Sequence, residues 1–113
     1  MKANWYEPIR VLIVDDSAVV RRAVSDALSS DPEITVVGTA SNGNIALQRI
    51  RQLNPEILIL DIEMPEMDGF GVLRVLRAIY PRIRTIMFSS LTQRGAVQTI
   101  EALSLGANDY IAK

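Results

Sequence analysis

Two short runs made only of large apolar residues restrict the possible folds of this chain more than any other feature. They are residues 11–14, with the sequence VLIV, and residues 57–60, with the sequence ILIL. A strand with one face in water alternates apolar and polar residues, whereas a strand buried on both faces does not. The two runs therefore predict a central parallel sheet that is covered by helices on both faces.

Segments of two kinds alternate along the rest of the chain. The short segments rich in β-branched residues, which predict strands, are residues 9–14, 34–39, 57–60, 83–88 and 110–112. Apolar residues at helical spacing fall between them, in the four sets Val19, Val20, Ala23, Val24, Ala27 and Leu28; Ile45, Ala46, Ile50 and Leu53; Phe70, Leu73 and Leu76; and Ala96, Val97, Ile100 and Leu103. Each set predicts an amphipathic helix that packs its apolar stripe against the sheet. The alternation predicts an α/β open sheet with right-handed crossovers, but periodicity leaves the strand order open.

Residues that favour helix ends stand at the expected boundaries. The dipeptides that stop a helix before the next strand are Asp31-Pro32, Asn54-Pro55 and Tyr80-Pro81. Gly106 suits the left-handed residue that follows a fourth helix. The expected N-caps are Ser17, Asn42 and Thr92.

Composition excludes several classes of protein. A chain of 113 residues is expected to form one domain, and it has neither Cys nor His. A disulfide framework, a thiolate or His-ligated metal site and a Ser-His-Asp triad are therefore excluded. The net charge of −1 gives no general basic footprint, so we expect no direct nucleic acid binding. Because no apolar run approaches a membrane span and the N-terminus lacks a signal-peptide core, we expect a cytoplasmic protein without membrane insertion.

Three acidic residues follow or end strands of the predicted sheet. Asp15 and Asp16 come after the first strand, and Asp61 ends the third. A lone Asp at such a position commonly forms a turn or a cap, but chemistry in open α/β sheets collects at the carboxyl ends of the strands. Two unit charges about 5 Å apart repel by roughly 3 kcal/mol at an effective dielectric constant of 20, so a cluster favours a cation. An oxygen-only ligand set predicts a hard ion, with Mg²⁺ first.

Polar residues at the same edge suggest what accompanies the ion. Lys113 follows the fifth strand, and its compact charge suits a phosphate oxygen, although a surface lysine is the ordinary alternative. Ser89 and Ser90 end the fourth strand, where a hydroxyl could bond a phosphoryl oxygen; serine is also common at strand ends. Together with the acids, these residues predict a site for a phosphoryl group and Mg²⁺.

Four motifs, in the same order, resemble the receiver domain of two-component response regulators. They are residues 14–17 (VDDS), 61–69 (DIEMPEMDG), 88–90 (FSS) and 110–113 (YIAK). The likeness runs from about Ile9 to Lys113. Within the family, residues 16–22 and 89–96 resemble the receiver half of the chemotaxis protein-glutamate methylesterase.

The resemblance implies a flavodoxin-like sheet with the strand order 2-1-3-4-5, and two parts of the chain. Residues 1–8 would be an N-terminal extension, and residues 9–113 the receiver domain. Domains of this family continue past the lysine into a fifth helix, which is absent from this sequence. We therefore expect a bare apolar patch near Val11, Ile13 or Ile111, and a longer parent protein.

The resemblance also assigns roles at the acidic edge. Asp61 would accept a phosphoryl group from the phosphohistidine of a sensor histidine kinase of the chemotaxis type. Asp16, Asp61 and the backbone carbonyl of Glu63 would hold Mg²⁺, and Asp15 would orient its waters. Lys113 would pair with the phosphoryl group. On this basis the chain would catalyse only its own phosphorylation and dephosphorylation.

The remaining implications concern the switch and the output. Ser89 would bond the phosphoryl group, completing a catalytic set with Asp61 and Lys113, and Tyr110 would change rotamer with it. The output would be a C-terminal methylesterase domain. The alternatives are a stand-alone receiver, the receiver of a DNA-binding transcriptional regulator and, outside the family, a magnesium-dependent phosphatase with Asp61 as nucleophile.

Overall fold

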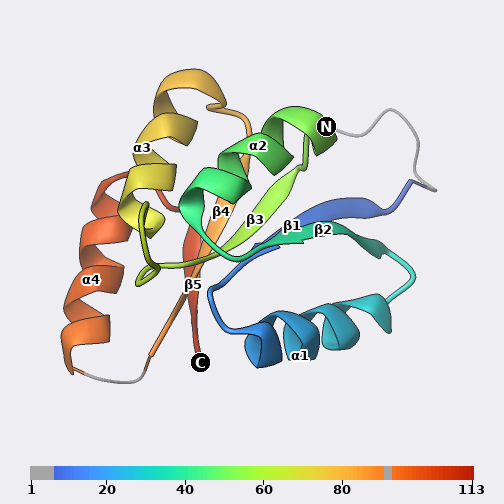
Figure 1. The fold of residues 1–113 in the computed structure, drawn as a ribbon, viewed down its shortest axis with the longest axis horizontal. Coiled ribbons are helices and arrows are strands. Elements are labelled where there is room, and N and C mark those ends of the chain that lie inside the picture. Colours follow the sequence, from blue (N-terminus) through green and yellow to red (C-terminus); the bar gives the residue numbers. More distant parts are fainter. Residues whose placement is uncertain (1–6, 91–92) are drawn as a thin grey trace.

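The computed structural model describes residues 7–90 and 93–113 as a five-stranded sheet with four helices. The strands are β1 (Ile9–Val14), β2 (Ile34–Ala40), β3 (Ile57–Asp61), β4 (Arg84–Ser89) and β5 (Asp109–Ala112). The helices are α1 (Ala18–Ser29), α2 (Gly43–Leu53), α3 (Gly69–Ile79) and α4 (Gln93–Ser104), as Figure 1 shows. All strands pair in parallel in the order β2-β1-β3-β4-β5, which confirms the predicted fold class and order. None of the described helices has the length and apolar character that crossing a membrane requires.

The ends of the helices follow the expected chemistry, with one addition. The side chains of Ser17 and Asn42 cap α1 and α2, each accepting a hydrogen bond from a backbone N–H three residues later. The predicted cap Thr92 lies outside the described residues. Asp68, which was not predicted, caps α3 in the same way. Gly106 has a φ of 110°, as expected for a residue that turns the chain after α4.

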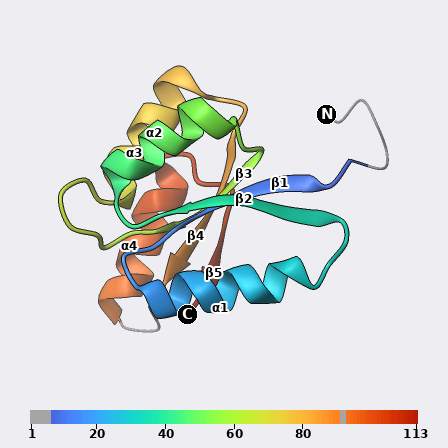
Figure 2. The same ribbon diagram turned by 45° about the vertical axis from the view of Figure 1, so that its right-hand side comes forward.

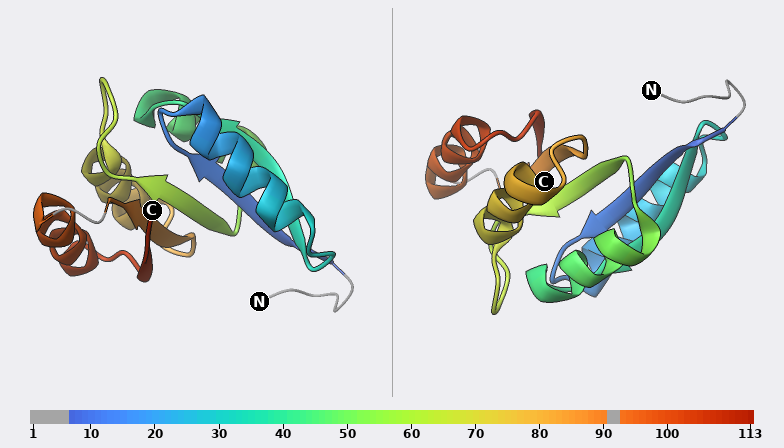
Figure 3. Two further views of the ribbon diagram at one scale, coloured as in Figure 1. Left: turned by 90° about the horizontal axis from the view of Figure 1, so that it is seen from below. Right: turned by 90° about the horizontal axis from the view of Figure 1, so that it is seen from above.

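The main core lies between the sheet and the helices α2, α3 and α4. Figure 2 shows α2 and α3 on the opposite side of the sheet from α1, and Figure 3 shows α4 at the opposite end of the sheet from β2. Leu12, Leu58 and Leu60 point into this core from the two central strands, where they meet Val72 and Leu73 of α3. All five side chains are fully buried. This face therefore carries most of the hydrophobic stabilisation.

The other face is covered, within the described residues, by α1 alone. Its cluster comprises Val11, Ile13 and Ile59, with half-buried neighbours that include Val24 and Leu28 of α1. No residue of α1 is fully buried. The expectation of a bare patch at Val11 and Ile13 is wrong because α1 covers both, whereas Ile111 on the edge strand β5 is 50% exposed.

Helix α4 presents a different face to the sheet than the sequence predicts. The expected core stripe, Ala96, Val97, Ile100 and Leu103, is exposed. Among residues 94–104 of α4, the buried ones are Gly95, Thr99 and Ala102. Small side chains allow this helix to lie close to β4, and its larger apolar residues consequently face outward.

Candidate functional site

The predicted acidic residues meet at the carboxyl edge of the sheet. Asp15 follows β1 and is 1% exposed, Asp61 is the last residue of β3 and is 5% exposed, and Asp16 is exposed. Carboxylate oxygens of the three lie within 4.8 Å of one another. The strand order explains this convergence, because β1 and β3 are direct neighbours.

Asp15 is fixed by contacts from the start of α1. Its Oδ1 accepts a hydrogen bond from the backbone N–H of Ser17 at 2.9 Å. Its backbone carbonyl accepts another, from Nη1 of Arg21 at 2.7 Å. Its buried Oδ2 lies 3.0 Å from Nζ of Lys113, and this ion pair balances its charge. Asp15 therefore has both carboxylate oxygens engaged, Oδ1 by the backbone of Ser17 and Oδ2 by the ammonium of Lys113. The sequence did not predict the contribution of Arg21.

Lys113 lies between the two buried carboxylates. Its Nζ is 3.0 Å from Oδ2 of Asp15 and 3.1 Å from Oδ1 of Asp61. Its backbone N–H donates to the carbonyl of Ser89 at 2.7 Å, which fixes the residue beside the end of β4. Nζ also lies 5.6 Å from the centre of the Phe88 ring, within the range of a cation–π contact. The predicted lysine thus stands where it faces both acids.

Burial and charge shift the proton affinities of this pair. Burial and the nearby charge of Asp15 raise the pKa of Asp61 to about 6, although Lys113 opposes the change. Burial lowers the pKa of Lys113, but its hydrogen bonds and charge interactions with Asp15 and Asp61 outweigh this, so its pKa is raised overall. Three carboxylates facing one ammonium leave the edge deficient in positive charge. Oxygen donors that share a negative charge suit a hard divalent cation.

A cavity of 250 Å³ opens beside these groups. It is lined by Asp16, Asp61, Ile62, Glu63, Ser89, Ser90, Gln98 and Lys113. Of the residues predicted to serve one site, the lysine, the two serines and the acids other than Asp15 therefore border one space. Gln98 is an addition from α4 that the sequence did not predict.

Glu63 lies beside the carboxylate cluster and does not join it. Its side chain is exposed, and Oε1 is 3.2 Å from Nε of Arg94 on α4. This ion pair links the loop after β3 to α4. The predicted contribution of Glu63 to a metal site is its backbone carbonyl, and that contribution stays a prediction.

The two predicted switch residues border a second cavity. Ser89 is buried, and its Oγ lies 2.6 Å from Oγ1 of Thr99. Tyr110 is 52% exposed and lines a cavity of 260 Å³ between α4 and β5, together with Ser89 and Thr99. Thr99 was missed because the apolar stripe of α4 was assigned to the wrong side. The helical spacing of Thr99 between two small residues, Gly95 and Ala102, is the signal that could have identified it.

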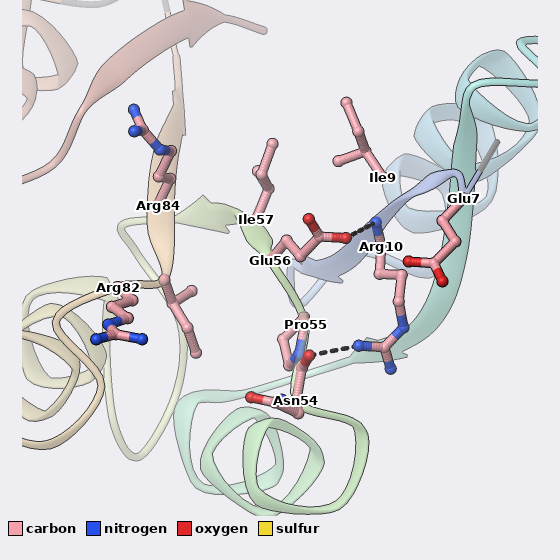
Figure 4. A pocket seen from close by; sticks show the side chains of 10 residues that line it. Glu7, Ile9, Arg10, Asn54, Pro55, Glu56, Ile57, Arg82 and Arg84 are labelled. Carbon is pink, nitrogen blue, oxygen red and sulfur yellow. Dashed lines mark hydrogen bonds between the residues drawn. The ribbon is translucent and has the colours of Figure 1, made fainter. Parts of the chain in front are cut away.

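A larger cavity than these two lies at the other end of the strands and has a different character. It measures 770 Å³ and is lined by Glu7, Ile9, Arg10, Asn54, Pro55, Glu56, Ile57, Arg82, Ile83 and Arg84. Figure 4 shows Arg10 donating to the carbonyl of Asn54, just after α2, while the backbone N–H of Arg10 donates to Glu56. These contacts hold a helix end against the sheet. No cluster of metal-ligating residues occurs there among the described residues.

The sheet order and the three carboxylates at its carboxyl edge define a flavodoxin-like α/β protein with an acidic site. The family model for the response regulator receiver domain matches residues 11–113. The chain belongs to the family of response regulator receiver domains.

Related proteins indicate which members of this family the chain is most similar in sequence to among those compared. The chain is 58% identical over 105 residues to a protein-glutamate methylesterase/protein-glutamine glutaminase of Nocardioides, covering 93% of this chain and 29% of the relative. It is 53% identical over 113 residues to the protein of the same name from Symbiobacterium thermophilum, covering 100% of this chain and 31% of that relative. The chain thus spans about three tenths of these relatives.

Solved structures agree with this likeness. The response regulator domain of Thermotoga maritima CheB is 45% identical with a TM-score of 0.87, over 95% of this chain and 79% of that one. A chain of the CheX–CheY–BeF₃–Mg²⁺ complex from Borrelia burgdorferi is 31% identical with a TM-score of 0.83, over 95% and 79%. The fold and the family assignment therefore rest on both sequence and structure.

Proposed function

We propose that this chain is a phosphoacceptor, in which Asp61 takes a phosphoryl group from the phosphohistidine of a sensor histidine kinase of the chemotaxis type. The observation that carries the proposal is the position of Lys113 between Asp15 and Asp61, beside a cavity that also holds Ser89. The receiver domain would span residues 9–113, with residues 1–8 as an extension. Its expected setting is the cytoplasm, where such kinases present their phosphohistidine.

The transfer uses groups that already face one another. A carboxylate oxygen of Asp61 attacks phosphorus, the new P–O bond forms, and the P–N bond to the kinase histidine breaks. The electron pair of that bond returns to the imidazole nitrogen, which takes a proton. With a pKa of about 6, Asp61 is mostly ionised at pH 7 and ready to attack. Lys113 would pair with the phosphoryl oxygens, and the Ser89 hydroxyl would donate to one of them.

The residues present fit Mg²⁺. Oxygens of Asp15, Asp16 and Asp61 lie within 4.8 Å of one another, and the two buried carboxylates, Asp15 and Asp61, share the single ammonium of Lys113. Asp16, Asp61 and the carbonyl of Glu63 would hold the ion, and Asp15 would orient its waters. When bound, it neutralises charge on the transferring phosphoryl group. A similar solved chain comes from a complex with BeF₃ and Mg²⁺, which supports this proposal.

Ser89 and Tyr110 would couple the phosphoryl group to the surface of α4 and β5. A phosphoryl group brings a charge of about −1.5 to −2 near neutral pH, and it needs hydrogen-bond donors. Ser89 and Tyr110 border the same cavity, so a shift of one leaves space for the other. The exposed apolar residues of α4, among them Val97 and Ile100, give that surface an apolar patch to which a partner protein could bind.

The output we favour is a protein-glutamate methylesterase domain after the receiver. The relatives at 53–58% identity carry that name, and the chain spans only 29–31% of their length. A stand-alone receiver, or one joined to a DNA-binding domain, is the alternative within the family. The sequence that follows Lys113 in the parent gene separates them. A phosphatase is disfavoured because Asp15 and Asp16 come a whole βαβ unit before Asp61.

Phosphorylation can be tested directly. The protein, incubated with a small phosphodonor and Mg²⁺, should gain one phosphate by intact-mass analysis and should turn over slowly. The Asp61→Asn variant should gain none. Asp26→Asn, which changes an exposed carboxyl on α1, is the matched control and should be labelled as the wild type is. Labelling of Asp61→Asn at the wild-type rate would contradict the assignment of Asp61.

A further inference from the structure

The hydroxyl of Ser89 is engaged by a neighbour outside the phosphoryl cavity. Ser89 Oγ lies 2.6 Å from Thr99 Oγ1, and the two residues are 6% and 4% exposed. Ser89 borders both cavities, the one beside Asp61 and the one beside Tyr110. Thr99 borders only the second. The hydrogen bond therefore holds the Ser89 hydroxyl on the side of Tyr110.

The direction of this hydrogen bond follows from the number of protons. Thr99 has one hydroxyl proton, and Oγ1 donates it to the carbonyl of Gly95, one turn earlier in α4, at 2.8 Å. Thr99 is then an acceptor toward Ser89, and Ser89 is the donor. Since Ser89 also has a single hydroxyl proton, it cannot donate to a phosphoryl oxygen until it leaves Thr99.

We propose that Thr99 is a positioning residue that holds Ser89 away from the phosphoryl site and thereby lowers the affinity of the resting protein for a phosphoryl group. The inference rests on the proposed function, because Ser89 is the donor to that group. Two acceptors, Thr99 Oγ1 and a phosphoryl oxygen, compete for one proton. Binding of a phosphoryl group therefore breaks the Ser89–Thr99 hydrogen bond, and the free energy of that bond is subtracted from the free energy of binding.

The size of the effect follows from the strength of one hydrogen bond. A buried hydrogen bond between neutral groups typically shifts an equilibrium by about two- to tenfold. Thr99→Val removes the acceptor and keeps the branched shape, so Ser89 is released without opening a cavity. Thr99→Ser keeps the hydroxyl and is the matched control. A variant that merely damages α4 would bind the anion more weakly, whereas the proposal requires tighter binding.

The experiment measures the binding of BeF₃⁻ in the presence of Mg²⁺ by calorimetry or NMR titration. Thr99→Val should bind about three- to tenfold more tightly than the wild type, and Thr99→Ser should match the wild type. In a Ser89→Ala background, Thr99→Val should bring no gain. Three results would each overturn the proposal. They are binding by Thr99→Val that is equal to or weaker than that of the wild type, a similar gain in affinity in Thr99→Ser, and a gain in affinity that persists in the Ser89→Ala background.

A second measurement tests Thr99 without any anion. In the free protein, NMR couplings should show one χ1 rotamer of Ser89 in the wild type and in Thr99→Ser, and averaged rotamers in Thr99→Val. A rotamer that is unchanged in Thr99→Val would overturn the role of Thr99. If the wild type bound no BeF₃⁻, the proposed function would fail, and the rotamer measurement would still decide whether Thr99 positions Ser89.

Discussion

The two ends of the strands both carry charged residues, yet they use them differently. At the carboxyl edge, Asp15 and Asp61 are buried and share one ammonium, that of Lys113, within 3.1 Å. At the amino edge, Arg82 and Arg84 are exposed, and Figure 4 shows them around a wide cavity. At the carboxyl edge an excess negative charge is buried, and a bound cation or a proton can balance it. At the amino edge the positive charges are solvated, so they cost little free energy of folding.

Arg10 shows what a satisfied charge does at the amino edge. Its guanidinium donates to the carbonyls of Leu53 and Asn54 at the end of α2. Positive charge at a helix C-terminus, bonded to its last carbonyls, stabilises the fold. The comparison shows two uses of charged side chains. A charge whose hydrogen-bond partners are all supplied by the protein, as for Arg10, stabilises the fold, whereas the excess negative charge of Asp15 and Asp61 is available to a ligand.

The largest expected effect is a gain in stability on removing the acceptor charge. Because burial and Asp15 raise the pKa of Asp61 to about 6, its ionised form opposes folding at pH 7. Asp61→Asn should raise the free energy of unfolding by about 2–3 kcal/mol without divalent cations, measured by chemical denaturation. The control Asp26→Asn, at an exposed carboxyl, should stay within about 0.5 kcal/mol of the wild type.

The same variant should change the pH dependence of stability. With a pKa of about 6 against the ordinary 3.8, the folded state binds more protons between these values than the unfolded state. The contribution of this carboxyl to stability therefore falls as pH rises from about 4 to about 6. The gain in Asp61→Asn should be small below about pH 4 and complete above about pH 7. A gain independent of pH would mean that charge is not its cause.

A smaller effect of opposite sign is expected for Lys113→Met. Removing the ammonium leaves two buried carboxylates facing each other, which raises the pKa of Asp61 further. We expect a loss of about 1–2 kcal/mol at pH 7, reduced by the partial exposure of the lysine side chain. The loss should be smaller in the Asp61→Asn background, because one of the two charges is then gone. An equal loss in both backgrounds would show that the lysine acts by packing alone.

The smallest effect belongs to the amino edge. Arg10→Met keeps the aliphatic stem and removes the hydrogen bonds to α2, so thermal or chemical denaturation should show a loss of about 1 kcal/mol. Arg84→Met, at an exposed arginine of the same cavity, is the control and should change stability by less than about 0.5 kcal/mol. Equal losses would remove the distinction between the two arginines.

Much of this molecule could be predicted from local pattern. The uninterrupted apolar runs of β1 and β3 identified the buried centre of a parallel sheet, and the carboxyl-end rule placed Asp15, Asp16 and Asp61 together. The strand order could be inferred only from the likeness to a family. Periodicity records which residues are buried, and it carries no information about which strands are neighbours.

What could not be predicted depends on contacts between distant elements. The stripe of α4 was misassigned because burial at a sheet edge favours small residues, Gly95 and Ala102 among them, over large ones. The contact between Arg21 and the backbone of Asp15 depends on the turn between β1 and α1. The pairing of Glu63 with Arg94 joins a loop to a helix 31 positions further along the sequence. No spacing rule signals such pairs.

The position of Lys113 ties the site to the least protected strand. All four residues of β5 are exposed, and β5 pairs with β4 alone at the edge of the sheet. Local unfolding of such a strand withdraws the ammonium from both acids at once, so the site exists only while β5 is docked. An anion that engages Lys113 binds the docked form and slows amide hydrogen exchange along β5 by mass action. The exchange rate of the amides of this strand thus reports the occupancy of the site through the population of its open form.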